Sequence, residues 1–239
     1  MANDYFQFQK FRVSQDKCAM KVSTDACLFG AWVPLLGKKV LDVGAGTGLL
    51  SLMAAQRLKG AGAIQAIEID PQAAQQAREN FDSSAYKGQI QLINEDFCTW
   101  CTQEKFHTII CNPPFFRDST TPLDQSRAQA RHEASLTLAT LISTGHNLLT
   151  PNGSLGLIIP ADRLSQAIEE VNKHMHVRGV MMVRPTRGKE NNRVFVWASP
   201  TDGPRQTRYL TIYKTHGDYT LEAERLLQGF YLRFADKAN

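Results

Sequence analysis

The sequence predicts an α/β fold, built on a doubly wound, mostly parallel sheet with antiparallel strands at its C-terminal end. Two observations lead to this prediction. Within residues 38–160, apolar runs rich in β-branched residues alternate with helical patterns, as expected for parallel strands covered on both faces. Beyond residue 160, apolar runs follow one another with only short, turn-like connections, which favour antiparallel pairing.

The elements are expected in the following order. The first part should hold strands at 38–45, 62–70, 89–96, 106–114 and 153–160, separated by helices at 48–58, 71–81 and 135–149. Pro71 in a first helical turn and Gly60 just past a helix end support these boundaries. The second part should hold a helix at 161–176 and strands at 178–185, 193–200 and 208–214. The polar segment 116–133 is expected to be a loop that orders on binding.

Length and composition limit the classes of protein. The 239 residues, 43% hydrophobic and 21% charged, suit one soluble α/β domain. No apolar run approaches the roughly 20 residues that span a bilayer, and no signal peptide is expected at the N-terminus. The net charge of +4 permits a polyanionic partner without requiring one. The five scattered cysteines are typical of reduced thiols in the cytoplasm, and neither the single CxxC at 98–101 nor "HMH" at 174–176 predicts a metal site.

The stretch "VLDVGAGTG" (40–48) predicts a strand that runs into a glycine-rich turn and then a helix. Gly44, Gly46 and Gly48 allow the backbone to approach a ligand closely, with N–H groups at the start of the helix. The spacing G-x-G-x-G differs from the dinucleotide fingerprint G-x-G-x-x-G. Asp42 stands in the strand where a nicotinamide-binding protein usually has an apolar residue. On its own, a glycine-rich turn of this kind is weak evidence for a ligand site.

Acidic residues follow the next two strands. Glu68 comes 20 residues after Gly48, at the end of the second strand, where an acid can grip ribose hydroxyls. Asp96 ends the third expected strand. Ligands of open α/β sheets bind at the carboxyl ends of the strands, so Asp42, Glu68 and Asp96 should line one crevice. The alternative is that Asp70 and Asp96 only cap following helices.

The stretch "CNPPFF" (111–116) ends the fourth strand with a rigid ledge. Proline cannot continue a sheet ladder, and each proline forces the residue before it into an extended conformation. Asn112, Pro113 and Pro114 therefore hold one amide and bare carbonyl groups still beside the crevice, with Phe115 next to them. We expect Phe116 to be a core aromatic or a contact to the substrate.

In this order and spacing, "DVGAGTG", "IEID", "EDF" and "NPPFF" resemble the class I S-adenosylmethionine methyltransferases that modify amino groups. The segments at 16–32, "DKCAMKVSTDACLFGAW", and at 218–234, "DYTLEAERLLQGFYLRF", are similar to the bacterial valine-tRNA adenine N6-methyltransferases. The resemblance implies a Rossmann-like class I methyltransferase fold and S-adenosylmethionine as the cofactor. It also implies one methyltransferase domain over 1–239, in which 1–37 pack over the cofactor site and 178–239 form C-terminal strands and a tail.

The same resemblance assigns the residues that hold the cofactor. Asp42 and the glycines should lie along the methionine part, Glu68 should bind the ribose, and Asp96 with the Phe97 amide should bind the adenine. The full expected set is Lys21, Thr24, Asp25, Asp42, Gly44, Ala45, Gly46, Gly48, Glu68, Ile69, Asp96, Phe97 and Asn112. Thr24 can also be the N-cap of a helix that carries Asp25 in its first turn.

The ledge suits an amine as the methyl acceptor. The exocyclic nitrogen of adenine is a poor nucleophile, because its lone pair is delocalised into the ring. Two acceptors, the Asn112 side-chain oxygen and the Pro113 carbonyl, would favour a pyramidal nitrogen with its lone pair aimed at the sulfonium. The base can stack on Phe115, which contributes about 1–3 kcal/mol. We therefore expect Asn112, Pro113, Pro114 and Phe115 to be the catalytic residues.

The expected reaction is N6-methylation of an adenine in tRNA, at position 37 of a valine tRNA by the resemblance. A ribosomal RNA guanine-N2 methyltransferase, a protein glutamine methyltransferase and a non-catalytic cofactor-binding scaffold remain alternatives. The base must be unstacked to enter such a pocket, and basic residues around its mouth would hold the RNA. These contacts are expected from Phe116, Arg117, Arg127, Arg131, Arg184, Arg187, Lys189 and Arg193. We expect a monomer that needs no metal and no membrane.

Overall fold

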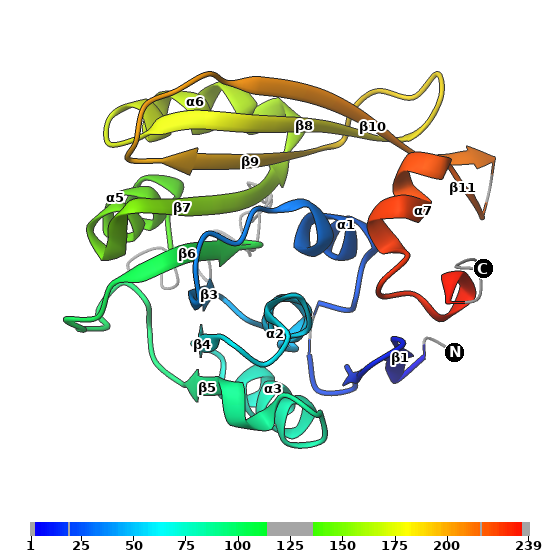
Figure 1. The fold of residues 1–239 in the computed structure, drawn as a ribbon, viewed down its shortest axis with the longest axis horizontal. Helices are drawn as coiled ribbons and strands as arrows, with labels where there is room; N and C mark the ends of the chain where they lie inside the picture. Colours follow the sequence, from blue (N-terminus) through cyan, green and yellow to red (C-terminus); the bar gives the residue numbers. More distant parts are fainter. Residues whose placement is uncertain (1–2, 19, 114–135, 216, 236–239) are drawn as a thin grey trace, which may run out of the picture.

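The computed structural model describes residues 3–18, 20–113, 136–215 and 217–235 (Figure 1). A nine-stranded sheet runs through this part of the chain in the order β11-β10-β8-β9-β7-β6-β3-β4-β5. The bounds of its strands are β3 Lys39–Val43, β4 Ala63–Ile67, β5 Ile90–Ile93, β6 Phe106–Cys111, β7 Leu149–Pro160, β8 His176–Thr186, β9 Arg193–Ser199, β10 Gln206–Thr215 and β11 Asp218–Tyr219. A separate hairpin pairs β1 (Tyr5–Gln7) with β2 (Arg12–Ser14).

Helices cover both faces of the sheet. They are α1 Thr24–Trp32, α2 Leu49–Leu58, α3 Pro71–Asp82, α5 Leu138–Leu148, α6 Leu164–Asn172 and α7 Leu221–Leu227, with short 3-10 helices at Lys87–Gln89, Ala161–Arg163 and Leu232–Phe234. One core packs α1, α2, α3 and α7 against one face, and a second core packs α5 and α6 against the other. The doubly wound α/β prediction is therefore confirmed.

The strand directions agree with the predicted parallel sheet and add one detail. β3 pairs in parallel with β4 and β6, and β6 pairs in parallel with β7. β9 is antiparallel to both of its neighbours, as predicted for the C-terminal end. β10, however, pairs in parallel with β8 and not with β9, so the chain leaves β9 and crosses over β8 before it rejoins the sheet.

Several elements are shorter than the sequence predicts. β5 stops at Ile93 and β6 at Cys111, so Asp96 and Asn112 lie in the loops that follow these strands. The helix expected at 135–149 begins at Leu138, because Thr137 caps it by accepting from the Thr140 N–H at 3.0 Å. The helix expected at 161–176 is shorter, and residue 176 already belongs to β8.

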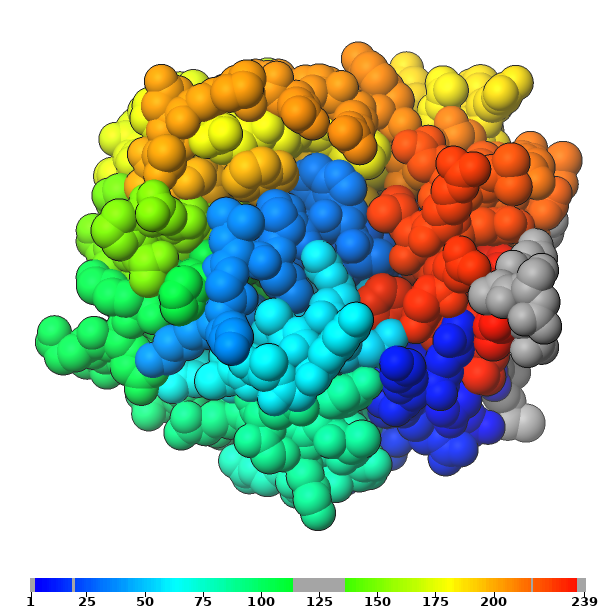
Figure 2. Space-filling view, viewed as in Figure 1, coloured from blue at the N-terminus to red at the C-terminus, as the bar shows by residue number. Residues whose placement is uncertain are grey.

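The N-terminal hairpin was not predicted, because three-residue strands carry too little pattern. It packs against the C-terminal end of the chain, and Figure 2 shows the two segments in contact. The Phe8 ring lies 5.9 Å from the Tyr231 ring, and Gln9 donates from its N–H to the Phe230 carbonyl at 2.8 Å. Both aromatic residues are buried in the core beside α1 and α7.

The parallel pairing determines where a ligand can bind. The carboxyl ends of β3, β4, β6, β7, β8 and β10 all meet at one edge of the sheet, here called the carboxyl edge. The loops after β3, β4 and β6 begin at this edge. Arg193 pairs with Pro160 at the end of β7, and it also forms an ion pair with Asp25 in the first turn of α1. The N-terminal end of α1 therefore lies at the carboxyl edge as well.

The contact of α1 with the sheet can be tested at Gly156. A Cβ atom at this position of β7 would overlap the Val33 side chain, which follows α1. We expect Gly156→Ala to lower the free energy of unfolding by about 1–3 kcal/mol, because the core cannot accept the added methyl without repacking. Urea unfolding measures the effect. Gly88→Ala is the matched control, since a Cβ there meets no atom within 4 Å; equal stability of the two variants would contradict the packing described.

Candidate active site

The glycine-rich turn joins β3 to α2 and forms an open cradle. Gly44, Gly46 and Gly48 all have positive φ angles, of 70°, 55° and 81°. Cβ atoms at Gly44 and Gly46 would meet nothing within 4 Å, whereas one at Gly48 would overlap the Phe81 ring of α3. The first two glycines thus leave space for a ligand, and the third allows α3 to pack closely against the turn. Ala45 is buried, and its N–H donates to the Ile67 carbonyl at 3.1 Å.

Glu68 holds the cradle in place. Its carboxylate accepts from the Gly46 N–H at 2.8 Å through Oε2 and from the Asp70 N–H at 2.9 Å through Oε1. Each carboxylate oxygen can accept a second hydrogen bond, so the hydroxyls of a ribose still have acceptors here. The next residue, Ile69, is 57% exposed, and such an apolar side chain beside a crevice offers a surface for a flat ring. Asp70 caps α3, as the alternative in the sequence analysis proposed.

Asp42 is a fully buried acid directly below the cradle. Its Oδ2 accepts from the Ser51 hydroxyl of α2 at 2.7 Å, while Oδ1 is buried with no hydrogen-bond partner among the described residues. Burial raises the pKa of Asp42 to about 7, and the nearby Glu68 carboxylate adds to this. Ser51 was missed in the sequence; its position on the buried stripe of a helix is the one signal that could have identified it.

Asp96 lies three residues beyond the end of β5, half-buried, with Phe97 buried next to it. Its Oδ1 accepts from the Cys98 N–H at 2.8 Å, and its carbonyl accepts from the Trp100 N–H at 2.8 Å. The carboxylate therefore caps a turn and not a helix. The Asp96 Oδ1 accepts the capping hydrogen bond, so Oδ2 can still accept from the amine of an adenine.

The segment before α1 lies near the same crevice. Ser23, and not Thr24, is the N-cap of α1: its hydroxyl accepts from the Ala26 N–H at 3.2 Å. Thr24 shares a hydrogen bond of 3.2 Å with the Tyr213 hydroxyl, and burial raises the pKa of Asp25, although Arg193 opposes the shift from 3.6 Å. Lys21 is exposed, with its Nζ 3.5 Å from the Asn3 carbonyl.

The ledge begins beside the glycine turn. Cys111, the last residue of β6, stands opposite Val43, the last residue of β3. The next residues of the two strands, Asn112 and Gly44, therefore leave the sheet side by side. Asn112 is half-buried and Pro113 is buried. The predicted site residues Pro114, Phe115, Phe116, Arg117, Arg127 and Arg131 lie outside the described residues.

The basic stretch 184–193 divides into two kinds of residue. The Arg184 Nε donates to the Thr211 hydroxyl at 2.8 Å across β8 and β10, and Arg193 pairs with Asp25. Both guanidinium groups thus have partners within the protein. Arg187 and Lys189 are exposed in the turn between β8 and β9, which lies at the carboxyl edge. These two remain the candidates of this stretch for contact with a polyanion.

Asn80 also contacts the glycine turn, and the sequence analysis missed it. It is buried on α3, and its Nδ2 donates to the Thr47 carbonyl of the glycine turn and to the Ser14 carbonyl, both at 2.9 Å. Its Oδ1 accepts from the Ser14 N–H at 2.8 Å. Asn80 therefore ties the N-terminal segment to the cradle. A buried asparagine in an amphipathic helix was the available signal.

Three observations concern the membrane, metal ions and disulfide bonds. No helix in the described ranges is long and apolar enough to cross a membrane. Among the same residues, no three His, Cys, Asp or Glu side chains are grouped so that they could hold a metal ion. All five cysteines are free thiols.

Solved structures with the same fold support the class. A predicted O-methyltransferase from Agrobacterium tumefaciens superposes with a TM-score of 0.68 at 21% identity, over 86% of this chain and 96% of that one. A Listeria monocytogenes protein assigned to the class I S-adenosylmethionine-dependent methyltransferases superposes with a TM-score of 0.57 at 15% identity, over 85% of this chain and 67% of that one. The fold is that of the class I methyltransferases.

Sequence comparison is more specific. Residues 26–179 match the model of the methyltransferase small domain. A tRNA1(Val) (adenine(37)-N6)-methyltransferase from Bacteroides thetaiotaomicron is 38% identical, over 97% of this chain and 99% of the relative. The protein of the same name from Tolumonas auensis is 35% identical, over 98% of this chain and 100% of the relative. The chain belongs to the tRNA1(Val) (adenine(37)-N6)-methyltransferase family, as its resemblance predicted.

The buried Asp42 predicts a pH-dependent stability. Its pKa is raised in the folded state, so the native protein holds a proton that the unfolded chain releases above about pH 4. The stability from this proton is complete below pH 4 and is lost as the pH rises through 7. Asp42→Asn has no such proton to lose. The free energy of unfolding of the variant minus that of the wild type should therefore rise by roughly 2–3 kcal/mol from pH 5 to pH 8.

Urea unfolding of the wild type and of Asp42→Asn at several pH values measures this difference. Asp82→Asn, which removes an exposed carboxylate of α3, serves as the matched control. If the stabilities of the wild type and of Asp42→Asn run parallel with pH, Asp42 does not hold a proton in the folded protein.

Proposed function

We propose that this protein transfers a methyl group from S-adenosylmethionine to N6 of adenine 37 in tRNA1(Val). The observation that carries the proposal is the register of β3 and β6, since it brings Asn112 and Pro113 beside the glycine cradle. An amine held by the ledge then lies next to a ligand held by the turn. The full-length similarity to relatives of this name supports the choice of substrate.

The residues of the cradle fit the proposed cofactor. The space above Gly44 and Gly46 admits a ligand close to the backbone, and the buried, unpartnered Oδ1 of Asp42 offers it an acceptor. Glu68 faces the ribose, and Ile69 and Asp96 face the adenine ring. When bound, S-adenosylmethionine supplies a methyl group made electrophilic by its sulfonium. An ionised Asp42 favours this cationic group, so cofactor affinity should rise with pH around 7.

The segment at 16–25 covers the cofactor in this proposal. Burial raises the pKa of the Cys18 thiol to about 11, and the charge of Glu68 contributes, so Cys18 lies close to this carboxylate. The Lys17 N–H donates to Gln76 of α3 at 2.9 Å, and this bond holds the segment against the cradle. Thr24 and Asp25 at the start of α1, with Lys21 before them, then approach the methionine part.

The ledge prepares the adenine amine. The Asn112 side-chain oxygen and the Pro113 carbonyl accept its two hydrogens, which frees the nitrogen lone pair for attack. The prolines hold both acceptors still, so little reorganisation is needed in the reaction. Phe115 provides the stacking surface. No strong general base is required, because methylation makes the departing N–H proton acidic.

The RNA is proposed to bind at the carboxyl edge. Arg187 and Lys189 contact phosphates there, together with Phe116, Arg117, Arg127 and Arg131 of the segment that follows the ledge. We also propose that the protein acts as one catalytic domain and as a monomer. A reducing cytoplasm suits the five free thiols.

The role of Asn112 is tested by Asn112→Ala. The lost acceptor matters most as the amine becomes pyramidal, so turnover should fall on the order of a hundredfold, from a loss of roughly 2–4 kcal/mol. Single-turnover methyl transfer to unmodified tRNA1(Val) gives the rate, and nucleoside mass spectrometry identifies the product. Calorimetry should find cofactor affinity near that of the wild type.

Asn172→Ala, at the exposed end of α6, is the control for the loss of one amide. An Asn112→Ala protein that methylates at the wild-type rate would mean that the ledge is structural. A wild-type protein that forms no N6-methyladenosine in this tRNA would contradict the proposed function itself.

The phosphate contacts are tested by the double variant Arg187→Ala, Lys189→Ala. Each lost phosphate contact should reduce the slope of log affinity against log salt by about 0.7–0.9. Filter binding of tRNA from 50 to 200 mM salt measures the slope, with Lys87→Ala, an exposed residue near β5, as the control. An unchanged slope would assign both side chains to solvated surface.

A further inference from the structure

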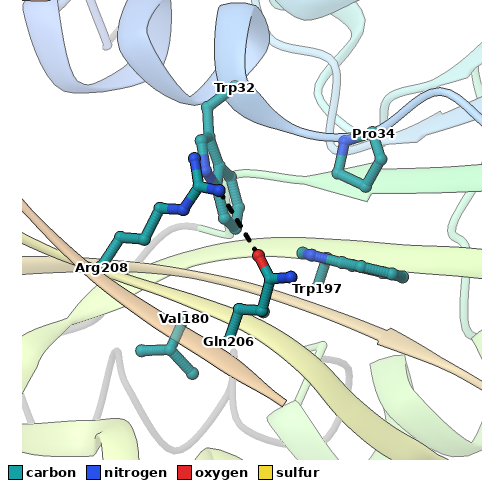
Figure 3. Close-up of a pocket in the computed structure, with 7 residues that line it drawn as sticks. Trp32, Pro34, Val180, Trp197, Gln206 and Arg208 are labelled. Carbon is teal, nitrogen blue, oxygen red and sulfur yellow. Dashed lines mark hydrogen bonds between the residues drawn. The ribbon is translucent and has the colours of Figure 1, made fainter. Parts of the chain in front are cut away.

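A second hollow lies on the α1 face of the sheet, away from the carboxyl edge (Figure 3). Its volume is about 250 Å³, and its walls are formed by Trp32, Pro34, Gly179, Val180, Trp197, Gln206 and Arg208. We call it the indole hollow. It exists because α1 packs on β7 and β9, and α7 packs near the carboxyl end of β10. Among the described residues, no helix covers the amino-terminal halves of β8 and β10 on this face.

Two indole rings line the indole hollow. Trp32 ends α1, and its ring rests on Phe195 with centroids 5.8 Å apart. Trp197 of β9 stands opposite both Gly156 and Gly179, and its ring lies over Gly179, where a Cβ would overlap it. Figure 3 shows the two rings entering the space from the helix and from the sheet. Both are half-buried, so each keeps exposed ring surface.

The polar side chains of the indole hollow come from β10. Gln206 and Arg208 are both exposed. The Arg208 guanidinium donates a long hydrogen bond, of 3.4 Å, to the Gln206 side-chain oxygen. In Figure 3 both extend toward the indoles. An amide or a guanidinium can hydrogen-bond to the edge of a nucleobase, and an aromatic ring can stack on its face. The indole hollow contains both kinds of group.

The surroundings carry positive charge. Arg178 lies over the Trp197 ring with its guanidinium carbon 5.7 Å from the centroid, and Arg205 is exposed directly before β10. The nearby acid, Asp202, has its carboxylate 3.5 Å from His176. Arg178, Arg205 and Arg208 thus outnumber Asp202, and this balance favours an anionic ligand.

The position of the indole hollow relates it to the proposed active site. Trp32 lies two turns along α1 from Asp25, a distance of about 10 Å at 1.5 Å per residue. Asp25 lies at the carboxyl edge, where the target adenine is proposed to bind. A single RNA strand can therefore reach both places along the same face of the molecule.

We propose that the indole hollow binds a second, unpaired nucleotide of the RNA substrate, with its base against the exposed ring surface of Trp32 and Trp197. Arg208 contacts its phosphate or base, and Gln206 contacts the base edge. The inference rests on the proposed function in that the RNA is the substrate tRNA. The hollow thereby holds the RNA strand while the adenine is extruded toward Asn112, which adds affinity and positions the loop.

Stacking can be observed directly by fluorescence. The chain has three tryptophans, and two of them line the indole hollow, so Trp100→Phe leaves emission from Trp32 and Trp197 alone. A single-stranded RNA tetranucleotide should quench this emission in a saturable manner. The additional change Arg208→Glu should weaken that binding at least fivefold or abolish it, because it reverses the charge beside the ring.

Affinity for the full tRNA gives the second measurement. Arg208→Glu and Trp32→Leu should each raise the dissociation constant by about five- to a hundredfold, as the loss of one stacked base does. Arg78→Ala, on the exposed surface of α3, is the control for a lost arginine. Trp32 packs on the core, so thermal unfolding must show that the Trp32→Leu protein is still folded. If it is not, the Arg208→Glu variant decides, because Arg208 is exposed.

The two hypotheses fail separately. If the wild type methylates tRNA while RNA causes no quenching and Arg208→Glu binds tRNA as the wild type does, the indole hollow is no nucleotide site. If the tetranucleotide quenches the emission and Arg208→Glu abolishes this, but the wild type methylates no tRNA, the hollow binds RNA and the proposed substrate is wrong. Quenching that Arg208→Glu leaves unchanged would also overturn the assignment.

Discussion

The carboxylate of Glu68 joins two backbone segments at the centre of the site. One oxygen accepts from Gly46 in the turn after β3, and the other accepts from Asp70 at the start of α3. Hydrogen bonds to a charged acceptor are the stronger kind, and here they fix a turn whose glycines have no side chains to hold it. The open cradle, the packing of α3 under Gly48 and the place of Asn112 beside Gly44 all depend on the turn staying in this position.

Much of the fold was predictable because parallel strands and their helices leave strong local patterns. Apolar runs identified β3, β4, β6 and β7 with ends within about four residues, and the capping Asp70 with Pro71 located the start of α3. The cradle was predictable for the same reason. Gly44, Gly46 and Gly48 all have positive φ angles, which favour glycine. Glu68 follows the apolar run of β4, so its place at a strand end could be predicted.

What the sequence did not predict depends on contacts between distant segments. The parallel pairing of β10 with β8 needs a crossover that no local signal encodes, and the β1–β2 hairpin is stabilised by residues some 220 positions away. Asn80 and Ser51 bond to residues of other elements, and Trp32 and Trp197 come together in one hollow only through the tertiary fold. Arg184 and Arg193 look like free surface charges in the sequence, yet each has found a partner within the fold.

The contacts between the two ends of the chain affect the order in which the protein can fold during synthesis. Phe8 pairs with Tyr231, and Thr24 at the start of α1 bonds to Tyr213, so the first segment is secured by residues made among the last. During synthesis, which proceeds from the N-terminus, the glycine cradle can form while the N-terminal hairpin and α1 still lack the C-terminal contacts. The start of α1 therefore lacks the contact to Tyr213 until the residues of β10 have been made and folded.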